Sequence, residues 1–243
     1  MRGLRIGLQA PATSLQGTRR THSGRHSFVI RLRTATALWC VFAALPALAA
    51  SSELDSLLKK IETRYNQAGS IKLVFSETYA GIRRPVQTES GVLYLRKPGR
   101  MRWDYTSPQG KVFLSDGKEV FEYTPGDQQA VKSKLKQTED MRAPLAFLLG
   151  KLDFKKEFKS FQAKPDAAGT WIVAEPKSEN LAYTEVEFLA SPEGEIRQVR
   201  FTLQDTSKMS LAFSNEELNI PVVASIFTFH PPPGVQVVDQ SEQ

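Results

Sequence analysis

The sequence has few of the residues on which catalysis and metal binding usually depend. It contains one cysteine, Cys40, and three histidines, of which only His230 lies beyond residue 50. After residue 50 there is therefore no disulfide and no cysteine metal site, and Ser–His catalysis would depend on one histidine. His230 directly precedes three prolines, a position typical of a surface residue. We therefore expect no enzymatic activity, no catalytic residue, no metal and no cofactor.

The sequence also lacks an apolar run of the roughly 20 residues that a membrane span needs. Its longest such run, Thr34–Leu48, follows seven arginines with no acidic residue in the first 50 positions and leads into Ala47-Leu48-Ala49. This pattern predicts a secretory signal peptide over residues 1–49 and a single domain over residues 50–243. An uncleaved membrane anchor is the alternative. The long stretch before the apolar run also fits a start codon assigned too far upstream.

Without the predicted signal peptide, the sequence has no excess of positive charge. The whole chain has a net charge of +6, but 7 of its 32 basic residues and none of its 26 acidic residues precede residue 51, which leaves −1 for the remainder. No basic nucleic-acid-binding surface is predicted. A secreted domain of this kind is expected to be a monomer in the periplasm of a bacterium with two membranes.

The residues that are present alternate between apolar and polar, which is the pattern of half-buried strands. The alternation is clearest in residues 91–123, where Met101, Trp103 and Tyr105 fall on one face of a strand. Asp116-Gly117 is a strong signal for a two-residue hairpin turn within this stretch. The stretch therefore predicts an antiparallel meander with large aromatic side chains on one face.

Helical patterns are fewer. Leu54–Tyr65 has apolar residues at helical spacing, with Ser51 or Ser52 as a cap and Gly69 as an end, and Met141–Gly150 predicts a short apolar helix. The other predicted strands are Ile71–Tyr79, Gln87–Leu95, Gln129–Lys134, Phe154–Ala163, Thr170–Pro176, Tyr183–Ala190, Ile196–Gln204, Met209–Asn219 and a last short strand in the tail. The fold class is thus mainly β (α+β). We expect a single strongly curved antiparallel sheet, an unclosed half-barrel of about ten or eleven strands, with helices as a lid over an apolar cavity.

Several motifs together resemble the LolA-type outer-membrane lipoprotein carriers. They are G-V-L-Y-L-R-K-P-G-R-M-R-W-D-Y from residue 91, S-P-Q-G from 107, S-D-G-K from 115, M-R-A-P-L-A-F-L-L-G from 141 and F-T-F-H-P-P-P-G-V-Q-V-V-D from 227. The resemblance implies a carrier that takes triacylated lipoproteins from an inner-membrane ATP-binding-cassette exporter to an outer-membrane acceptor. It also implies an unclosed barrel with a helical lid.

The resemblance implies which residues hold acyl chains. Expected wall residues of the cavity are Phe75, Leu93, Leu95, Met101, Trp103, Tyr105, Phe113, Phe121 and Tyr123, and expected lid residues are Leu145, Phe147, Leu148 and Leu149. Ordinary core packing is the alternative for each. Lys97 stands where the family often has an arginine that bonds the lid helix, so we predict that Lys97 is a looser lid latch. The alternative is a solvated lysine.

Other functions remain open at this point. A protein of the same fold could bind another apolar lipid or could sense lipid stress in the envelope, whereas an enzyme acting on acyl lipids has the least support. Arginines at 83, 84, 100 and 102 would form either a docking surface or a solvated one. Asp153, Glu157 and the Glu216-Glu217 pair are interpreted as ordinary surface charges.

Overall fold

The computed structural model describes residues 45–81, 85–135, 152–179 and 181–241, with the backbone alone for the first six of them. All of these belong to one compact unit, Ala44–Gln243. Most of the predicted signal peptide and the whole predicted helix Met141–Gly150 lie outside the described residues.

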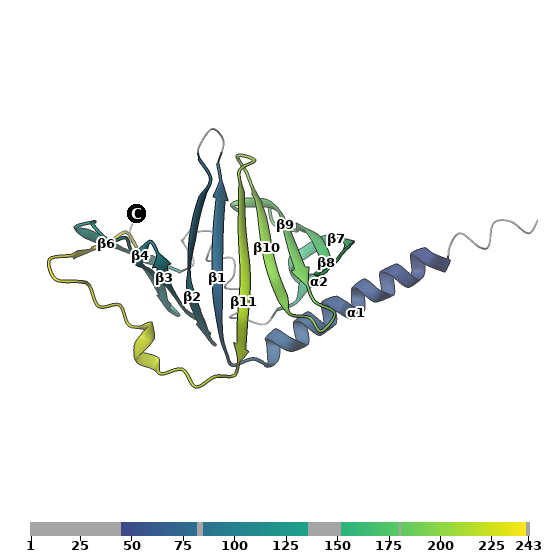
Figure 1. Cartoon of the computed structure of the whole chain (residues 1–243), viewed down its shortest axis with the longest axis horizontal. Coiled ribbons are helices and arrows are strands. Elements are labelled where there is room, and N and C mark those ends of the chain that lie inside the picture. Colours follow the sequence, from purple (N-terminus) through teal and green to yellow (C-terminus); the bar gives the residue numbers. More distant parts are fainter. Residues whose placement is uncertain (1–44, 82–84, 136–151, 180, 242–243) are drawn as a thin grey trace, which may run out of the picture. The chain divides into compact units, whose positions relative to one another are not determined.

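One sheet of 12 strands makes up most of this unit (Figure 1), in the order β12-β6-β5-β4-β3-β2-β1-β11-β10-β9-β8-β7. Consecutive strands pair antiparallel within each of two meanders, β1 to β6 and β7 to β11. The pairing of β1 with β11 joins the two meanders. The strands are β1 (Ser70–Ala80), β2 (Gln87–Arg96), β3 (Arg100–Ser107), β4 (Gln109–Asp116), β5 (Glu119–Tyr123), β6 (Gln129–Lys134), β7 (Phe158–Asp166), β8 (Gly169–Pro176), β9 (Tyr183–Ala190), β10 (Ile196–Leu203), β11 (Lys208–Leu218) and β12 (Gln236–Asp239).

The sheet is open, because its two outermost strands, β12 and β7, are not neighbours in the described part of the chain. An open, mainly β architecture was expected, but the expected count of ten or eleven strands is too low. The short strand β12 pairs parallel with β6, whereas the other described neighbours are antiparallel. Strands β7 to β11 lie between β6 and β12 in the chain, so this parallel pair joins segments that are far apart in the sequence.

Helix α1 (Leu45–Gln67) packs against one face of the sheet. It begins inside the predicted signal peptide, several residues before the expected serine cap. Leu58, Ile61 and Tyr65 lie one turn apart and are almost fully buried. No helix in the described part of the chain is both long and apolar enough to cross a membrane.

The main core lies on the face that α1 covers, which we call the inner face. Its largest fully buried side chains include Trp103, Phe113 and Phe201, from strands on both sides of β1. Each buried side chain of this size contributes roughly 1.5–3 kcal/mol to folding. The inner face is therefore apolar across most of the sheet.

The strand predicted over Phe154–Ala163 begins later than expected. Asp153 caps one helical turn, α2 (Phe154–Glu157), by accepting a hydrogen bond from the backbone N–H of Lys156. An Asp at this position satisfies a free N–H of the turn and favours helix over strand. The turn places Phe154 in the core, where its ring meets that of Phe188 edge to face at 5.6 Å.

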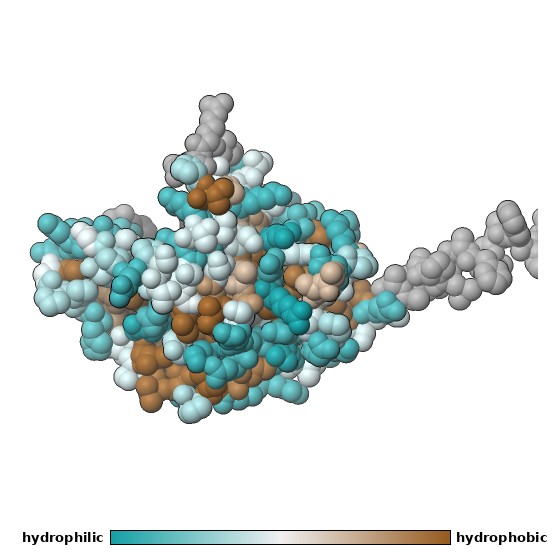
Figure 2. Space-filling view, in the orientation of Figure 1, coloured by the Kyte–Doolittle hydropathy of each residue, from teal (hydrophilic) through white to brown (hydrophobic). Residues whose placement is uncertain are grey.

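The opposite, outer face is crossed by residues 219–241, which we call the C-terminal segment. It contains a 3-10 turn, η2 (Ala224–Phe227), and ends in β12. Arg102 Nη1 donates a hydrogen bond to the carbonyl oxygen of Ile226 at 2.8 Å, and Arg96 Nη1 donates to that of Val222 at 2.9 Å. Figure 2 shows apolar residues gathered along this segment between β11 and η2.

Candidate functional site

The inner face of β2, β3 and β4 is built around Trp103. Trp103 lies opposite Leu93 on one side and Phe113 on the other, and Met101 lies opposite Leu95. All five of these side chains are at most 1% exposed. Alternation along paired strands aligns such residues in rows across the sheet, and the rows make a continuous apolar surface.

Aromatic rings continue this surface onto β1. The ring of Phe75 meets that of Trp103 at 4.7 Å and that of Tyr105 at 5.0 Å, both edge to face. Edge-to-face pairs fix ring orientation beyond what apolar burial alone achieves. The structure therefore brings together seven of the predicted wall residues, namely Phe75, Leu93, Leu95, Met101, Trp103, Tyr105 and Phe113.

Two predicted wall residues, Phe121 and Tyr123, lie on the outer face. Phe121 pairs across strands with Leu114, which is buried but lies outside the inner core cluster, and its ring stacks on that of Phe229 at 5.3 Å. Tyr123 follows two positions later and so shares this face. The residue of β5 that joins the inner core cluster is Val120. The four predicted lid residues, Leu145, Phe147, Leu148 and Leu149, lie outside the described residues.

One end of the apolar surface borders charged residues. Lys111 Nζ lies 2.6 Å from Glu89 Oε2 and 4.7 Å above the centre of the Tyr105 ring. The Tyr105 hydroxyl donates to Glu77 Oε2 at 3.2 Å. Because these residues alternate with the outward-facing ones, they share the inner face with Trp103. The inner face therefore changes from apolar to charged along the direction of the strands.

Lys97 contacts the C-terminal end of α1. Its ammonium donates to the carbonyl oxygen of Tyr65 at 2.6 Å and to that of Asn66 at 3.4 Å. These carbonyls have no partner within a helix, and a cation is favoured beside them. Burial lowers the pKa of Lys97 below its ordinary value. Lys97 is thus a bonded residue rather than a solvated one, and its partner in the described chain is α1.

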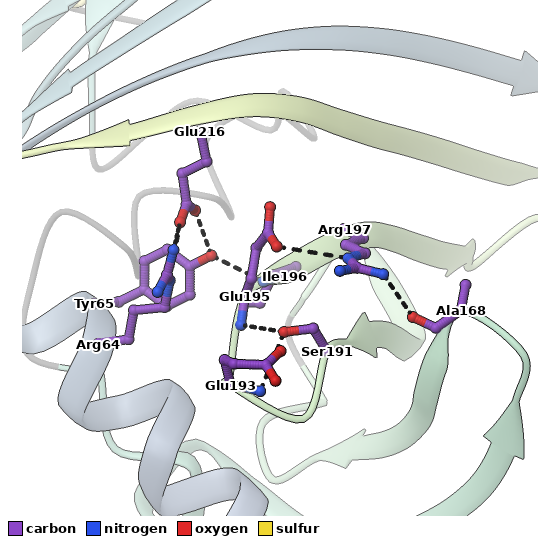
Figure 3. A network of polar contacts seen from close by, with 9 residues as sticks. All are labelled: Arg64, Tyr65, Ala168, Ser191, Glu193, Glu195, Ile196, Arg197 and Glu216. Carbon is purple, nitrogen blue, oxygen red and sulfur yellow. Dashed lines mark hydrogen bonds and ion pairs between the residues drawn. The ribbon is translucent and has the colours of Figure 1, made fainter.

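A buried ionic network holds the same end of α1 to the sheet (Figure 3). Arg64 donates to Glu216 Oε1, with Nη2 at 2.5 Å, and the Tyr65 hydroxyl donates to Glu216 Oε2 at 2.6 Å. The Tyr65 oxygen also accepts the backbone N–H of Ile196 at 2.9 Å. Burial and the neighbouring Glu216 raise the pKa of Tyr65 well above its ordinary value. For Arg64, burial lowers the pKa, but Glu216 offsets this and the net change is upward.

The turn between β9 and β10 fits closely against α1 in the same network. Ser191 Oγ accepts the backbone N–H groups of Glu193 and Glu195. Lys60 Nζ donates to the carbonyl oxygen of Pro192 at 2.9 Å. Gly194 has a φ of +83°, and a Cβ there would lie 2.9 Å from the backbone nitrogen of Ile61. A glycine is therefore required both by the turn and by the proximity of the helix.

The sequence interpretation missed Glu216. It grouped Glu216 with Glu217 as a surface pair, yet the Glu216 side chain is 3% exposed, whereas that of Glu217 is 52% exposed and pairs with Lys72. The signal that separates them is alternation, since adjacent strand residues face opposite sides. Of the four arginines considered for docking, residues 83 and 84 lie outside the described residues. Arg100 bonds the carbonyl oxygen of Asp116, and Arg102 bonds Asp104 and the C-terminal segment.

His230 is exposed in the C-terminal segment. Among the described residues, no group of three or more His, Cys, Asp or Glu side chains could hold a metal ion.

Comparison with known proteins then gives the family. Residues 66–230 match the model of the family described as outer membrane lipoprotein carrier protein LolA, and the chain belongs to this family. It is 29% identical over 203 residues to an outer-membrane lipoprotein carrier protein of Dechloromonas aromatica (strain RCB), an alignment that covers 82% of this chain and 93% of that protein.

Solved structures with related folds include a LolA superfamily protein from Nitrosomonas europaea, with a TM-score of 0.41 and 11% identity, covering 72% of this chain and 97% of that chain. Another is an uncharacterized conserved protein from Thermus thermophilus, with a TM-score of 0.49 and 12% identity, covering 77% of this chain and 99% of that chain.

Proposed function

We propose that this protein is a periplasmic carrier that binds the acyl chains of lipoproteins released from the inner membrane and delivers them to an outer-membrane acceptor. The observation that supports this most is the continuous apolar inner face centred on Trp103, in a member of the lipoprotein carrier family. In this proposal the seven inner-face residues contact the acyl chains. An inner-membrane ATP-binding-cassette exporter supplies the cargo, a triacylated lipoprotein, and the carrier acts as a monomer without a cofactor.

The energetics of acyl chains explain why such a carrier is needed. Moving a chain from lipid to water costs about 0.8 kcal/mol per CH₂ group, so a triacylated protein does not leave a membrane unaided. A carrier must offer the acyl chains a comparable apolar surface, and it must also be able to release its cargo. The inner face offers that surface when a covering element moves aside.

We propose that the covering element that moves is the segment Met141–Gly150 rather than α1. The C-terminal half of α1 is attached to the sheet by the Glu216 network and by Lys97. Asn66 adds a pair of hydrogen bonds to the backbone of Leu152, two positions after that segment. Leu145, Phe147, Leu148 and Leu149 then act as the lid, and Lys97 acts on lid opening through the end of α1 that it holds.

A release assay tests the carrier function. Purified protein is added to spheroplasts that synthesise a labelled lipoprotein, and the supernatant is analysed for a soluble one-to-one complex. We expect labelled lipoprotein to leave the membrane with the protein. The variant Met101→Gln, on the inner face, should release less than Val74→Gln, on the outer face, once both variants are shown to be folded by circular dichroism.

Other outcomes of this assay favour other functions. If the lipoprotein stays in the membrane while free lipid is extracted, the protein is a carrier of another apolar lipid. If neither is extracted and the protein instead forms a stable complex with a membrane signalling protein, it is a sensor of envelope lipid stress.

A further inference from the structure

The indole N–H of Trp103 has no hydrogen-bond acceptor among the residues that the structure describes. The nitrogen is inaccessible to solvent, and the whole residue is 0% exposed. Its cross-strand neighbours, Leu93 and Phe113, have no side-chain acceptor to offer, and its ring contacts Phe75 edge to face. A buried donor of this kind is rare, because leaving it unpaired lowers stability.

The position of this donor along the inner face is informative. Tyr105 follows Trp103 by two residues on the same face of β3, which corresponds to about 7 Å. Tyr105 already belongs to the charged end of the face, with Glu77 and Lys111 beside it. On the other side of Trp103, Met101 and Leu95 are apolar and buried. Across the sheet Trp103 is at the centre of the apolar surface, but along β3 it is the last apolar position before the charged end.

Acylated molecules have the same order of chemical groups. Hydrocarbon chains are followed by ester or amide carbonyls and then by a polar head. A carbonyl oxygen accepts one hydrogen bond readily, and a tryptophan N–H at an apolar–polar boundary is well suited to donate it.

We propose that the indole N–H of Trp103 donates a hydrogen bond to the carbonyl oxygen of an acyl linkage, and that this bond makes the inner face select acyl chains over alkyl chains. The inference rests on the proposed function, because it requires that lipid chains bind the inner face. It adds that Trp103 is a specificity-determining residue and that the preferred ligand has an ester or amide carbonyl next to its chains.

Matched lipids test the selection. The full chain is titrated with 1,2-dioctanoylglycerol, which has two ester carbonyls, and with 1,2-dioctylglycerol, which has ether oxygens in their place. We expect the dissociation constant for the ester to be lower by about fivefold to tenfold, the usual effect of one neutral hydrogen bond whose loss leaves a buried donor unpaired. Trp103→Phe should reduce this ratio to near one, and Trp171→Phe, with Trp171 instead stacked against Arg200, should leave it unchanged.

A second measurement does not depend on the folding of that variant. In a chain that carries Trp39→Phe and Trp171→Phe, Trp103 is the remaining tryptophan. We expect its emission to shift to longer wavelength with the ester and to shift less with the ether. A second pair, N-octyloctanamide and dioctyl ether, shows whether an amide carbonyl is also selected.

The outcomes are distinct. If the carbonyl lipid and its ether counterpart bind equally to the unmodified chain in both pairs, or if Trp103→Phe keeps the preference, Trp103 is not the selecting group although lipid binding stands. If none of the lipids bind, the proposed function fails, and the selection fails with it. A preference that disappears in Trp103→Phe and persists in Trp171→Phe supports the assignment.

Discussion

Glu216 is a charged residue whose surroundings make it structural. A buried carboxylate without partners would cost several kcal/mol, whereas Glu216 accepts from Arg64 on one oxygen and from Tyr65 on the other. The three residues connect α1 to β11, and Tyr65 also reaches Ile196 at the start of β10. The Tyr65 side chain therefore joins three elements, α1, β10 and β11.

We expect Glu216→Gln to lower the free energy of unfolding by about 2–3 kcal/mol, because it removes a charged acceptor from Arg64 and disrupts the bond from Tyr65. The matched control, Glu217→Gln, lies on the exposed side of the same strand and should change stability by no more than about 0.5 kcal/mol. Urea denaturation followed by circular dichroism measures both. Equal effects in the two variants would show that the buried network contributes little.

Tyr65 should make stability depend on pH. Burial and Glu216 raise its pKa in the folded state, so the unfolded state loses the phenol proton first as pH rises. The stabilisation from this group is complete below about pH 10 and is lost as pH rises through the folded-state pKa. Tyr65→Phe should therefore lower the free energy of unfolding by about 1–3 kcal/mol at pH 8, and the difference from the unmodified chain should narrow above pH 10.

Urea denaturation at pH 8 and at pH 11 measures that difference. Tyr94→Phe is the control, because Tyr94 lies opposite Arg102 on the outer face and outside the network. A difference for Tyr65→Phe that stays constant or widens between the two pH values would contradict the prediction.

At the scale of elements, the end of α1 is held by Lys97. Burial disfavours the charged form of Lys97 and lowers its pKa, so a leucine at this position loses two hydrogen bonds but also removes a partly buried charge. Local opening is therefore a better measure than global stability. We expect Lys97→Leu to speed amide hydrogen exchange in the last turn of α1 by about tenfold.

Hydrogen exchange followed by mass spectrometry measures this effect, with Lys72→Leu as the control, since Lys72 pairs with the exposed Glu217. The soluble complex that forms in the release assay should also lose its lipoprotein faster when the carrier is Lys97→Leu. If both exchange and release are unchanged, Lys97 is not a latch.

The C-terminal segment is held to the outer face by Phe227, which is 2% exposed. We expect Phe227→Ala to lower the free energy of unfolding by about 3–5 kcal/mol, as truncation of a buried aromatic side chain usually does. Val223→Ala, at a residue that is 66% exposed, should have little effect. Thermal unfolding of the two variants compares them, and a similar small change in both would mean that this segment packs loosely.

Most strands could be predicted from alternation, because the sheet buries one face and the hydrophobic pattern has period two. The exceptions have identifiable causes, one local and one distant in the sequence. Phe154 has the aromatic character of a strand residue, but the Asp153 cap turns the chain into α2 first. Phe121 was expected inside because an aromatic residue was assumed to face the main core, whereas the C-terminal segment gives it a second, outer contact in Phe229.

The candidate site was predictable in part for the same reason. The Met101, Trp103 and Tyr105 face follows from local alternation, and its strand neighbours extend it. The Glu216 network could not be predicted, because it joins Arg64 to a residue 152 positions later, and no local pattern encodes such a contact. The partner of Lys97 is likewise set by the packing of α1.

At the scale of the whole molecule, the pairing of β1 with β11 holds the two meanders in one sheet. We expect a chain that ends after Thr206, without β11, to lose cooperative unfolding. A chain that ends after Gly234 lacks β12 alone and should stay folded, with a loss of about 1–2 kcal/mol for the removed edge contacts. Denaturation curves of the two truncated chains give the comparison, and a cooperative transition in the shorter one would contradict it.

The pairing of β1 with β11 also determines when the middle of the sheet can form during folding. Phe75, near the start of the sheet in the chain, lies beside Phe213, near its end. Contacts between such distant positions form slowly, because a long loop must close before they are made. The middle of the sheet is thus completed only after nearly all of the polypeptide is available. A chain that emerges from its N-terminus can pair the hairpins of β1 to β6 early, but it cannot join them to the rest of the sheet until β11 has emerged as well.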